Sequence, residues 1–303
     1  MEKLFFLSII LILIVYVVDL CYKEEVYDIN YNQNMYIRVK RDKTGKVDVI
    51  PFENYIIGVV AGEMPISFDI EALKAQAVAS RSYALVKMKQ NITNDYDVVD
   101  TISNQVYLDN DTLLNSWKDN YNENINKIID AVTSTSGEYM LYKGEVVNAF
   151  FFSTSTGKTE NCVEVFGGDL PYLVSVESHW DEDVSPIYQH QKHLKLLDFL
   201  DLLGLEYKDN ISLEIIDSTS TGRIKKLIIN GKEFKGSDIV NMLSLKSSFF
   251  NITQKDNDIY ITTKGYGHGV GMSQYGALGM ALEGYNYKDI LKHYYSGVDL
   301  AKI

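Results

Sequence analysis

A glutamate beside a Met-Pro pair is the first residue whose type and position could do acid–base chemistry. Apolar residues repeat at helical spacing after Pro51, and Met64-Pro65 stops the pattern, so a helix is predicted to end at Glu63. The partial negative charge of a helix C-terminus disfavours a carboxylate and raises its pKa. A carboxyl group of that kind can donate a proton near neutral pH. From the residues alone, a general acid and an exposed glutamate at a helix end are equally supported.

Two cations on a second predicted helix are the next candidates. This helix starts at Ser67 or Asp69, either of which can cap it, and runs to about Gln90. Lys74 and Arg81 are seven residues apart, which places them on one face among alanines and other apolar residues. If both point into a cleft, they can bind carboxylate or amide oxygens of a substrate. The alternative is that their long side chains reach solvent from a buried stripe.

A glycine-rich run near the C-terminus offers close backbone approach to a ligand. Glycine occupies every second position from Gly265 to Gly271, without the register of a dinucleotide fingerprint. His268 within the run either orients a catalytic group or is a turn residue. Gln274 and Tyr275 either donate hydrogen bonds to sugar hydroxyls or simply begin a helix.

The overall charge and the two cysteines exclude several classes of function. A formal net charge of -12, with no basic cluster, argues against a nucleic-acid partner. Cys21 and Cys162 make no disulfide framework. A zinc site on Cys162, His179, His190 and His193 lacks the usual close ligand pairs, and nothing local lowers the thiol pKa for a Cys162–His179 nucleophile. We therefore expect no metal and no cofactor.

The amino terminus is predicted to be a membrane signal anchor over residues 1–21. Leu4 to Val18 is an almost unbroken apolar run, with Lys3 before it and acidic residues after it, and no cleavage site follows. That charge asymmetry predicts a cytoplasmic N-terminus and an extracytoplasmic remainder. Residues 22–36 are predicted to be a tether to a domain over residues 37–303.

The remaining patterns predict an α+β fold, with a core sheet flanked by the helices of residues 51–90. An α/β subdomain is predicted to be inserted at about residues 190–250. The elements expected from turn and periodicity signals are two strands within Met35–Ile50, a hairpin over Glu138–Phe152, a helix from His190 to Leu205, strands on either side of Thr221-Gly222, a hairpin at Asn230-Gly231, a helix capped by Ser237 and a strand at Ile259–Thr263.

Four runs in one order resemble the stage II sporulation protein D and amidase-enhancer family. The resemblance extends from about Ile37 to Val298 and includes the single amino-terminal span. The runs are Gly62-Glu-Met-Pro65, Leu73-Lys-Ala-Gln-Ala-Val-Ala-Ser-Arg-Ser-Tyr-Ala84, Ser153-Thr-Ser-Thr-Gly-Lys-Thr-Glu160 and Gly265-Tyr-Gly-His-Gly-Val-Gly-Met-Ser-Gln-Tyr-Gly-Ala277.

The resemblance implies roles for particular residues. Glu63 becomes the catalytic acid and base, and Lys74 and Arg81 become important for activity. The chain departs from the family at Phe152, where a histidine is common, and at Thr156-Gly157, where a glycine pair is common. The further residues assigned to substrate binding are Ser153, Ser155, His268, Gln274 and Tyr275.

The implied activity is that of a peptidoglycan lytic transglycosylase. Such an enzyme needs one carboxyl group, because the C6 hydroxyl of MurNAc is the nucleophile and closes a 1,6-anhydro ring. The expected substrate is denuded glycan during engulfment of the forespore, beside stage II sporulation proteins P and M. The main alternative is a non-catalytic, glycan-binding enhancer of a cell-wall amidase. A zinc or cysteine peptidase is a third, weaker hypothesis.

Overall fold

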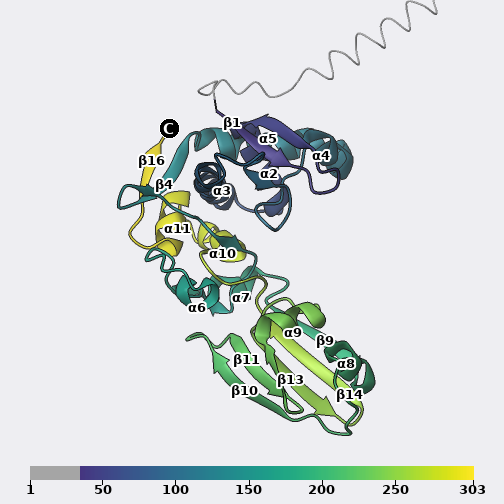
Figure 1. Cartoon of the computed structure of the whole chain (residues 1–303). Coiled ribbons are helices and arrows are strands. Elements are labelled where there is room, and N and C mark those ends of the chain that lie inside the picture. Colours follow the sequence, from purple (N-terminus) through teal and green to yellow (C-terminus); the bar gives the residue numbers. More distant parts are fainter. Residues whose placement is uncertain (1–34) are drawn as a thin grey trace, which may run out of the picture.

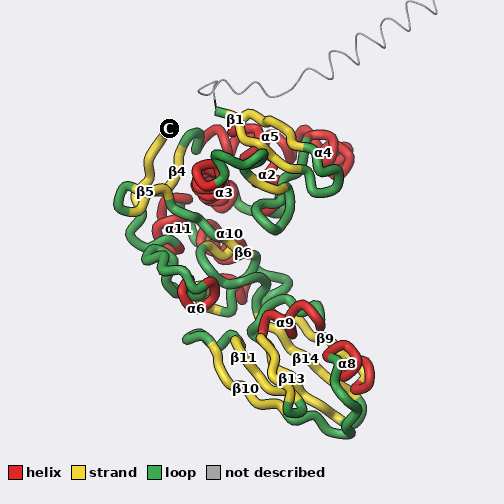
Figure 2. Tube along the Cα trace, viewed as in Figure 1, coloured by secondary structure: helices red, strands yellow, loops and turns green. Residues whose placement is uncertain are grey.

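The computed structural model describes the chain from Met35 to Ile303. The predicted anchor and nearly all of the predicted tether lie outside these residues. Across Met35–Ile303, no helix is both long and apolar enough to cross a membrane. The fold class is α+β, as predicted. The described residues form six sheets of only two or three strands each, and helices fill much of the space between them (Figures 1 and 2).

The first elements lead directly into the helix that ends at Glu63. Strands β1 (Tyr36–Lys40) and β2 (Val47–Pro51) form the predicted antiparallel pair, and β3 (Val98–Val99) adds to β1 in parallel. Helix α2 (Phe52–Glu63) follows at once. It stops where predicted, because the residue before Pro65 adopts an extended conformation that the proline ring favours.

Helix α3 (Ile70–Gln90) is the central element of the main region. Asp69 caps it by accepting a hydrogen bond from the backbone N–H of Glu71. Its alanines are fully buried, and small side chains allow neighbouring helices to approach closely. Figure 1 shows α3 surrounded by α2, α5 (Tyr121–Ser134), α10 (Gln274–Leu282) and α11 (Tyr287–Tyr294).

The C-terminal segment returns to the main region and completes it. Strand β16 pairs antiparallel with β4, and β15 pairs in parallel with β6. The hairpin predicted over Glu138–Phe152 is confirmed in its first half only, since β6 leaves it to join β15. The other elements here are α4 (Asn110–Trp117), the 3-10 helix η1 (Lys118–Asn120), β4 (Glu138–Tyr142), β5 (Glu145–Val146), β6 (Phe151–Phe152), β7 (Gly157–Lys158), α6 (Cys162–Phe166), β8 (Glu177–Ser178), α7 (Trp180–Val184), β15 (Met272–Ser273) and β16 (Asp299–Lys302).

Residues between α7 and β15 form a second group of elements with its own apolar cluster. Its buried members run from Leu196 to Ile261, and none of them belongs to the larger cluster of the main region. Figure 1 shows this group, in green, beyond α7 and apart from α2 and α3. Its elements are β9 (Gln189–Lys195), α8 (Leu196–Leu203), β10 (Leu213–Ser218), β11 (Ile224–Ile229), β12 (Lys232–Lys235), α9 (Gly236–Met242), β13 (Phe250–Lys255) and β14 (Asp258–Lys264).

Two element predictions in this group need correction. The helix expected from His190 begins only at Leu196, because Gln189–Lys195 pairs along the whole length of β14 and becomes a strand. Such pairing overrides a helical pattern in the sequence. Ser237 lies inside α9, whose cap position is Lys235. The Asn230-Gly231 hairpin is confirmed, with positive φ at both residues as a tight two-residue turn requires.

A buried ion pair at Arg81 ties α3 to its neighbours. The Arg81 side chain is completely buried and makes a bidentate contact with the carboxylate of Glu53, at 2.8 Å and 2.9 Å for the shortest Nη2 and Nε contacts. It also donates to the hydroxyl of Thr135 and to the backbone oxygen of Val132 in α5. The prediction that Arg81 is an exposed, substrate-binding cation is therefore wrong. Its donors are already bound within the protein core.

We expect Arg81→Ala to lower the free energy of unfolding by about 3 to 5 kcal/mol, because it leaves the carboxylate of Glu53 without its partner in a nearly buried site. Lys74→Ala is the matched control on the same face of α3. Lys74 pairs with Glu71 in a partly exposed site, so its loss should cost under about 1 kcal/mol. Urea unfolding of the two variants measures the difference, and equal stabilities would contradict a structural role for Arg81.

Candidate functional site

The backbone segment 104–108 lies directly against helix α2 and reaches Glu63. Gly58 and Gly62 are one turn apart on α2, and a Cβ atom at either would stand within 2.7 Å of this segment. The backbone N–H of Leu108 donates to the carbonyl of Gly58 at 3.2 Å. The N–H of Val106 then donates to Oε1 of Glu63 at 2.6 Å. The two glycines therefore let a backbone donor approach the carboxyl group.

Neutral hydroxyl and amide groups surround the same carboxyl group. The Tyr55 hydroxyl donates to Oε1 of Gln105 at 3.0 Å, and Nδ2 of Asn104 donates to the Tyr83 hydroxyl at 3.1 Å. Burial raises the pKa of both tyrosines, and the nearby Glu63 raises each further. Both phenols therefore stay protonated at neutral pH.

Burial raises the pKa of Glu63 from 4.5 to about 7. Hydrogen bonds from Val106 and Gln274 oppose this shift by stabilising the charged form. The sequence predicted a raised pKa from the position at the helix end, but desolvation is the main cause. Near pH 7 both the protonated and the ionised forms are populated, so the group can donate a proton and also accept one.

Of the residues predicted at the site, Gln274 contacts Glu63, and Tyr275 and Ser153 follow from it through the backbone of α10. Nε2 of Gln274, at the start of α10, donates to the backbone oxygen of Glu63 at 3.1 Å. The backbone N–H of the next residue, Tyr275, donates to the carbonyl of Ser153 at 3.1 Å. The ring of Tyr275 is partly exposed and packs edge-on against Phe68. Segments from three distant parts of the sequence therefore meet at the end of α2.

His268 lies in an aromatic environment and contacts no charged carboxylate of the site. The rings of Phe150, Phe152 and Phe166 are 5.1 to 6.1 Å from its ring, centroid to centroid. The N–H of Val270 donates to its Nδ1 at 3.1 Å. Burial first, and then the charge of Arg223, lower the pKa of His268 to about 4. The imidazole is thus neutral at physiological pH and suits a structural or orienting role.

Ser155 lies inside the protein, so the structure gives no support to its assignment to substrate binding. Its side chain is fully buried. Its hydroxyl donates to the backbone oxygen of Ser178 at 2.9 Å, and its N–H donates to Oδ1 of the buried Asp181 at 2.8 Å. The polar loop therefore contributes to an internal hydrogen-bond network at this position. Ser153, two residues earlier, is partly exposed.

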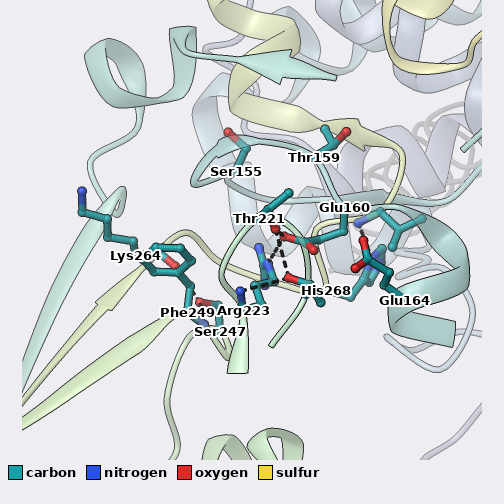
Figure 3. Close-up of polar contacts among 12 residues, drawn as sticks. Ser155, Thr159, Glu160, Glu164, Thr221, Arg223, Ser247, Phe249, Lys264 and His268 are labelled. Carbon is teal, nitrogen blue, oxygen red and sulfur yellow. Dashed lines mark hydrogen bonds and ion pairs between the residues drawn. The ribbon is translucent and has the colours of Figure 1, made fainter. Parts of the chain in front are cut away.

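Sequence reasoning missed a buried ion pair that joins the inserted group to this loop. Nε of Arg223 is 3.1 Å from Oε1 of Glu160, and both side chains are almost completely buried. Nη1 of Arg223 also donates to the carbonyl of Gly267 at 2.7 Å. Figure 3 shows Glu160, Thr221 and Arg223 clustered beside His268. Glu160 ends the run that begins at Ser153, but no local signal in the sequence pairs it with Arg223.

Lys74 and Arg81 share a face of α3, as predicted, but it is the wrong face for Glu63. At 100° per residue, Tyr83 beside Glu63 lies roughly 180° round the helix from Lys74 and roughly 160° from Arg81. Lys74 instead pairs with Glu71 at 2.7 Å. Arg81 pairs with Glu53, which stands at the other end of α2 and thus roughly 15 Å along the axis from Glu63.

Cys162 is a buried free thiol, and burial raises its pKa. A thiol of this kind is protonated and unreactive at neutral pH. Within the part of the chain that the structure describes, no group of three or more histidine, cysteine or acidic side chains could hold a metal ion. The geometry therefore offers acid–base chemistry at Glu63 and no support for a cysteine nucleophile.

The raised pKa of Glu63 predicts a pH-dependent stability. Between its ordinary value of 4.5 and its folded value of about 7, the folded chain binds more protons than the unfolded chain, so stability falls as pH rises. Glu63→Gln removes that effect. We expect the stability of this variant relative to wild type to increase by up to roughly 3 kcal/mol from about pH 4 to about pH 8.

Urea unfolding at several pH values measures this difference, with the exposed Glu283→Gln as the matched control. The free energy of unfolding of the control should differ from that of wild type by the same amount at every pH. If the difference for Glu63→Gln were also independent of pH, the Glu63 carboxyl would have an ordinary pKa in the folded protein.

Comparison with known proteins places these features in a family. Residues 40–142 match the SpoIID family, described as stage II sporulation protein. Stage II sporulation protein D of Bacillus amyloliquefaciens is 41% identical over 271 residues, covering 88% of this chain and 78% of that protein, and its counterpart from Bacillus subtilis (strain 168) is also 41% identical, covering 88% and 79%. A Bacillus subtilis protein named amidase enhancer is 30% identical over 297 residues, covering 80% of this chain and 40% of that protein. With such similarity over most of its length, the chain belongs to the stage II sporulation protein D family.

Proposed function

We propose that the chain is a lytic transglycosylase that cuts MurNAc–GlcNAc bonds in denuded peptidoglycan strands, with Glu63 as its acid and base. The observation that carries the proposal is the carboxyl group of Glu63, which is partly buried and whose pKa desolvation raises to about 7. It lies at the end of α2 inside one of the runs shared with the family. Two hydrogen bonds keep part of it ionised at neutral pH, so it can act in both proton transfers.

The surroundings of Glu63 support a mechanism with one carboxyl group. Protonated Glu63 gives its proton to the glycosidic oxygen as the bond to C1 of MurNAc breaks. The C6 hydroxyl of the same sugar attacks C1 and passes its proton to the Glu63 carboxylate, which restores the acid and leaves a 1,6-anhydro end. Ordinary glycosidases place a second carboxyl group roughly 5 to 9.5 Å away. Among the described residues, no second carboxylate contributes to the raised pKa of Glu63.

A second candidate function is a non-catalytic enhancer of a cell-wall amidase. The relative named amidase enhancer favours it. This chain covers only 40% of that relative, so the relative has long segments with no counterpart here. An enhancer needs a glycan-binding surface but no proton donor, and a glutamate with a pKa near neutral would then have no purpose.

The proposal extends to place and partners. The predicted anchor at residues 1–21 would hold the chain in the membrane, with its N-terminus in the cytoplasm and residues 37–303 outside. There it would meet the glycan between mother cell and forespore during engulfment, beside stage II sporulation proteins P and M. The net charge of -12 gives no basic surface for nucleic acid.

Glu63→Gln keeps the size of the side chain but cannot donate a proton as a carboxylic acid does. We expect the full-length variant to bind denuded glycan and to lose cleavage by about 100-fold to 10,000-fold, the contribution typical of a positioned acid or base. Mass spectrometry of the products from wild type should find 1,6-anhydro-MurNAc ends, one water lighter than hydrolysed ends. Glu283→Gln, at an exposed site, should cut at the wild-type rate.

Every other outcome of this cleavage experiment would reject a part of the proposal. Hydrolysed reducing ends would reject the transglycosylase mechanism but keep a glycosidase. Full activity in Glu63→Gln would show that another group is the acid. Binding without cleavage by wild type, with or without the partner proteins, would favour the enhancer.

A reporter enzyme fused after Ile303 tests the proposed location. It should be active only outside the cytoplasm, because Lys3 precedes the apolar run and acidic residues follow it. Cytoplasmic reporter activity, or a mature protein that lacks residues 1–21, would contradict the signal anchor.

A further inference from the structure

The side chain of Gln274 joins the end of helix α2 to the start of helix α10. It is only 7% exposed. Its Nε2 donates to the backbone oxygen of Glu63 at 3.1 Å, which places the amide beside the carboxyl group of the same residue, where it lowers the carboxyl pKa. A primary amide has two N–H donors, so one side chain can hold both groups of the same residue. With so little exposed surface and its amide held against Glu63, the Gln274 side chain has little capacity to bind a substrate.

A buried polar cluster at the start of α10 holds Gln274 in place. Ser273 caps α10 by accepting from the N–H of Gly276, and its hydroxyl donates to Oδ1 of Asp181. Asp181 is fully buried and also accepts from the N–H of Ser155 at 2.8 Å and from the hydroxyl of Ser178 at 2.6 Å. A satisfied buried network of this kind favours one arrangement of its members. The start of α10 is therefore held firmly against the main region.

We propose that Gln274 is a positioning residue, which holds the end of helix α2 at Glu63 and orients the carboxyl group, and that Asp181 and Ser273 hold Gln274 in place. This role rests on the proposed function, because it affects catalysis only if Glu63 is the acid. It replaces the expectation that Gln274 binds sugar hydroxyls. Without Gln274, the carboxyl group would keep a single donor, the N–H of Val106.

The groups that face Glu63 make this role measurable. They are the phenols of Tyr55 on α2 and Tyr83 on α3, the N–H of Val106, and the amide of Gln274 on α10. Both phenols are neutral throughout the range in which Glu63 titrates. Among the described residues, the N–H of Val106 and the amide of Gln274 are the groups that lower the pKa of this carboxyl group. Removal of the Gln274 amide should therefore act directly on the titration of Glu63.

Gln274→Met keeps the length of the side chain and removes its donors. Carbon-13 NMR of the full-length chain, with labelled glutamate and the Glu63→Gln spectrum to assign the signal, follows the titration of Glu63 without any need for cleavage. We expect the midpoint in Gln274→Met to rise by roughly 1 to 2 pH units, the worth of one hydrogen bond to the charged form. Gln274→Glu should raise it further, because two neighbouring carboxyl groups resist ionising together.

Gln254→Met is the matched control. Gln254 lies on β13 in the inserted group, where its Nε2 donates to the backbone oxygens of Asp209 and Asp256, so the same substitution should leave the Glu63 midpoint unchanged even if it lowers stability. An unchanged midpoint in Gln274→Met, or equal shifts in both methionine variants, would overturn the proposal. Where wild type cleaves glycan, the alkaline limb of its pH profile should move with the NMR midpoint in Gln274→Met. Absence of cleavage would count against the enzyme, whereas the NMR midpoint would still test the role of Gln274 separately.

Discussion

The contact between the glycine side of helix α2 and the backbone of residues 104–108 is the constraint on which the candidate site depends. Gly58 and Gly62 leave room for this backbone, so the Val106 N–H reaches Glu63 while the same contact shields the carboxyl group from water. A side chain at either glycine would push the segment away. The carboxyl group would then lose part of the shielding from water that raises its pKa. The proposed acid is thus a product of packing as much as of residue type.

Charged groups are separated on the two sides of helix α3. On one side Arg81 is buried and fully paired with Glu53, which stabilises the junction of α2, α3 and α5. On the other side Glu63 is surrounded by phenols, amides and a backbone N–H. A cation at contact distance would favour the carboxylate and lower its pKa by about one to three units. The orientation of α3 keeps Arg81 away, and this allows the glutamate to hold a proton near neutral pH.

The last segments of the chain complete a site that the first helices begin. Gln274 reaches Glu63 from 211 residues further along the sequence. Between them lies the inserted group, which the Arg223–Glu160 pair attaches to the polar run that ends at Glu160 and the Arg223 bond to Gly267 attaches to the glycine-rich loop before α10. Breaking one member of such a buried pair leaves an uncompensated charge. The insertion is therefore anchored at the loop that leads into the Gln274 helix.

The sequence by itself determined the local elements whose signals are short-range. The end of α2 at Glu63, the Asp69 cap and the Asn230-Gly231 turn all follow from neighbouring residues, and the four shared runs identify the family. Only the tertiary structure decided which groups meet. The sequence places Arg81 on a helix face but not against Glu53, and it gives Gln274 no partner. Gln189–Lys195 has a helical pattern and becomes a strand because β14 supplies its hydrogen bonds. Burial, which sets the pKa of Glu63, depends on contacts between distant segments, and no local pattern encodes those contacts.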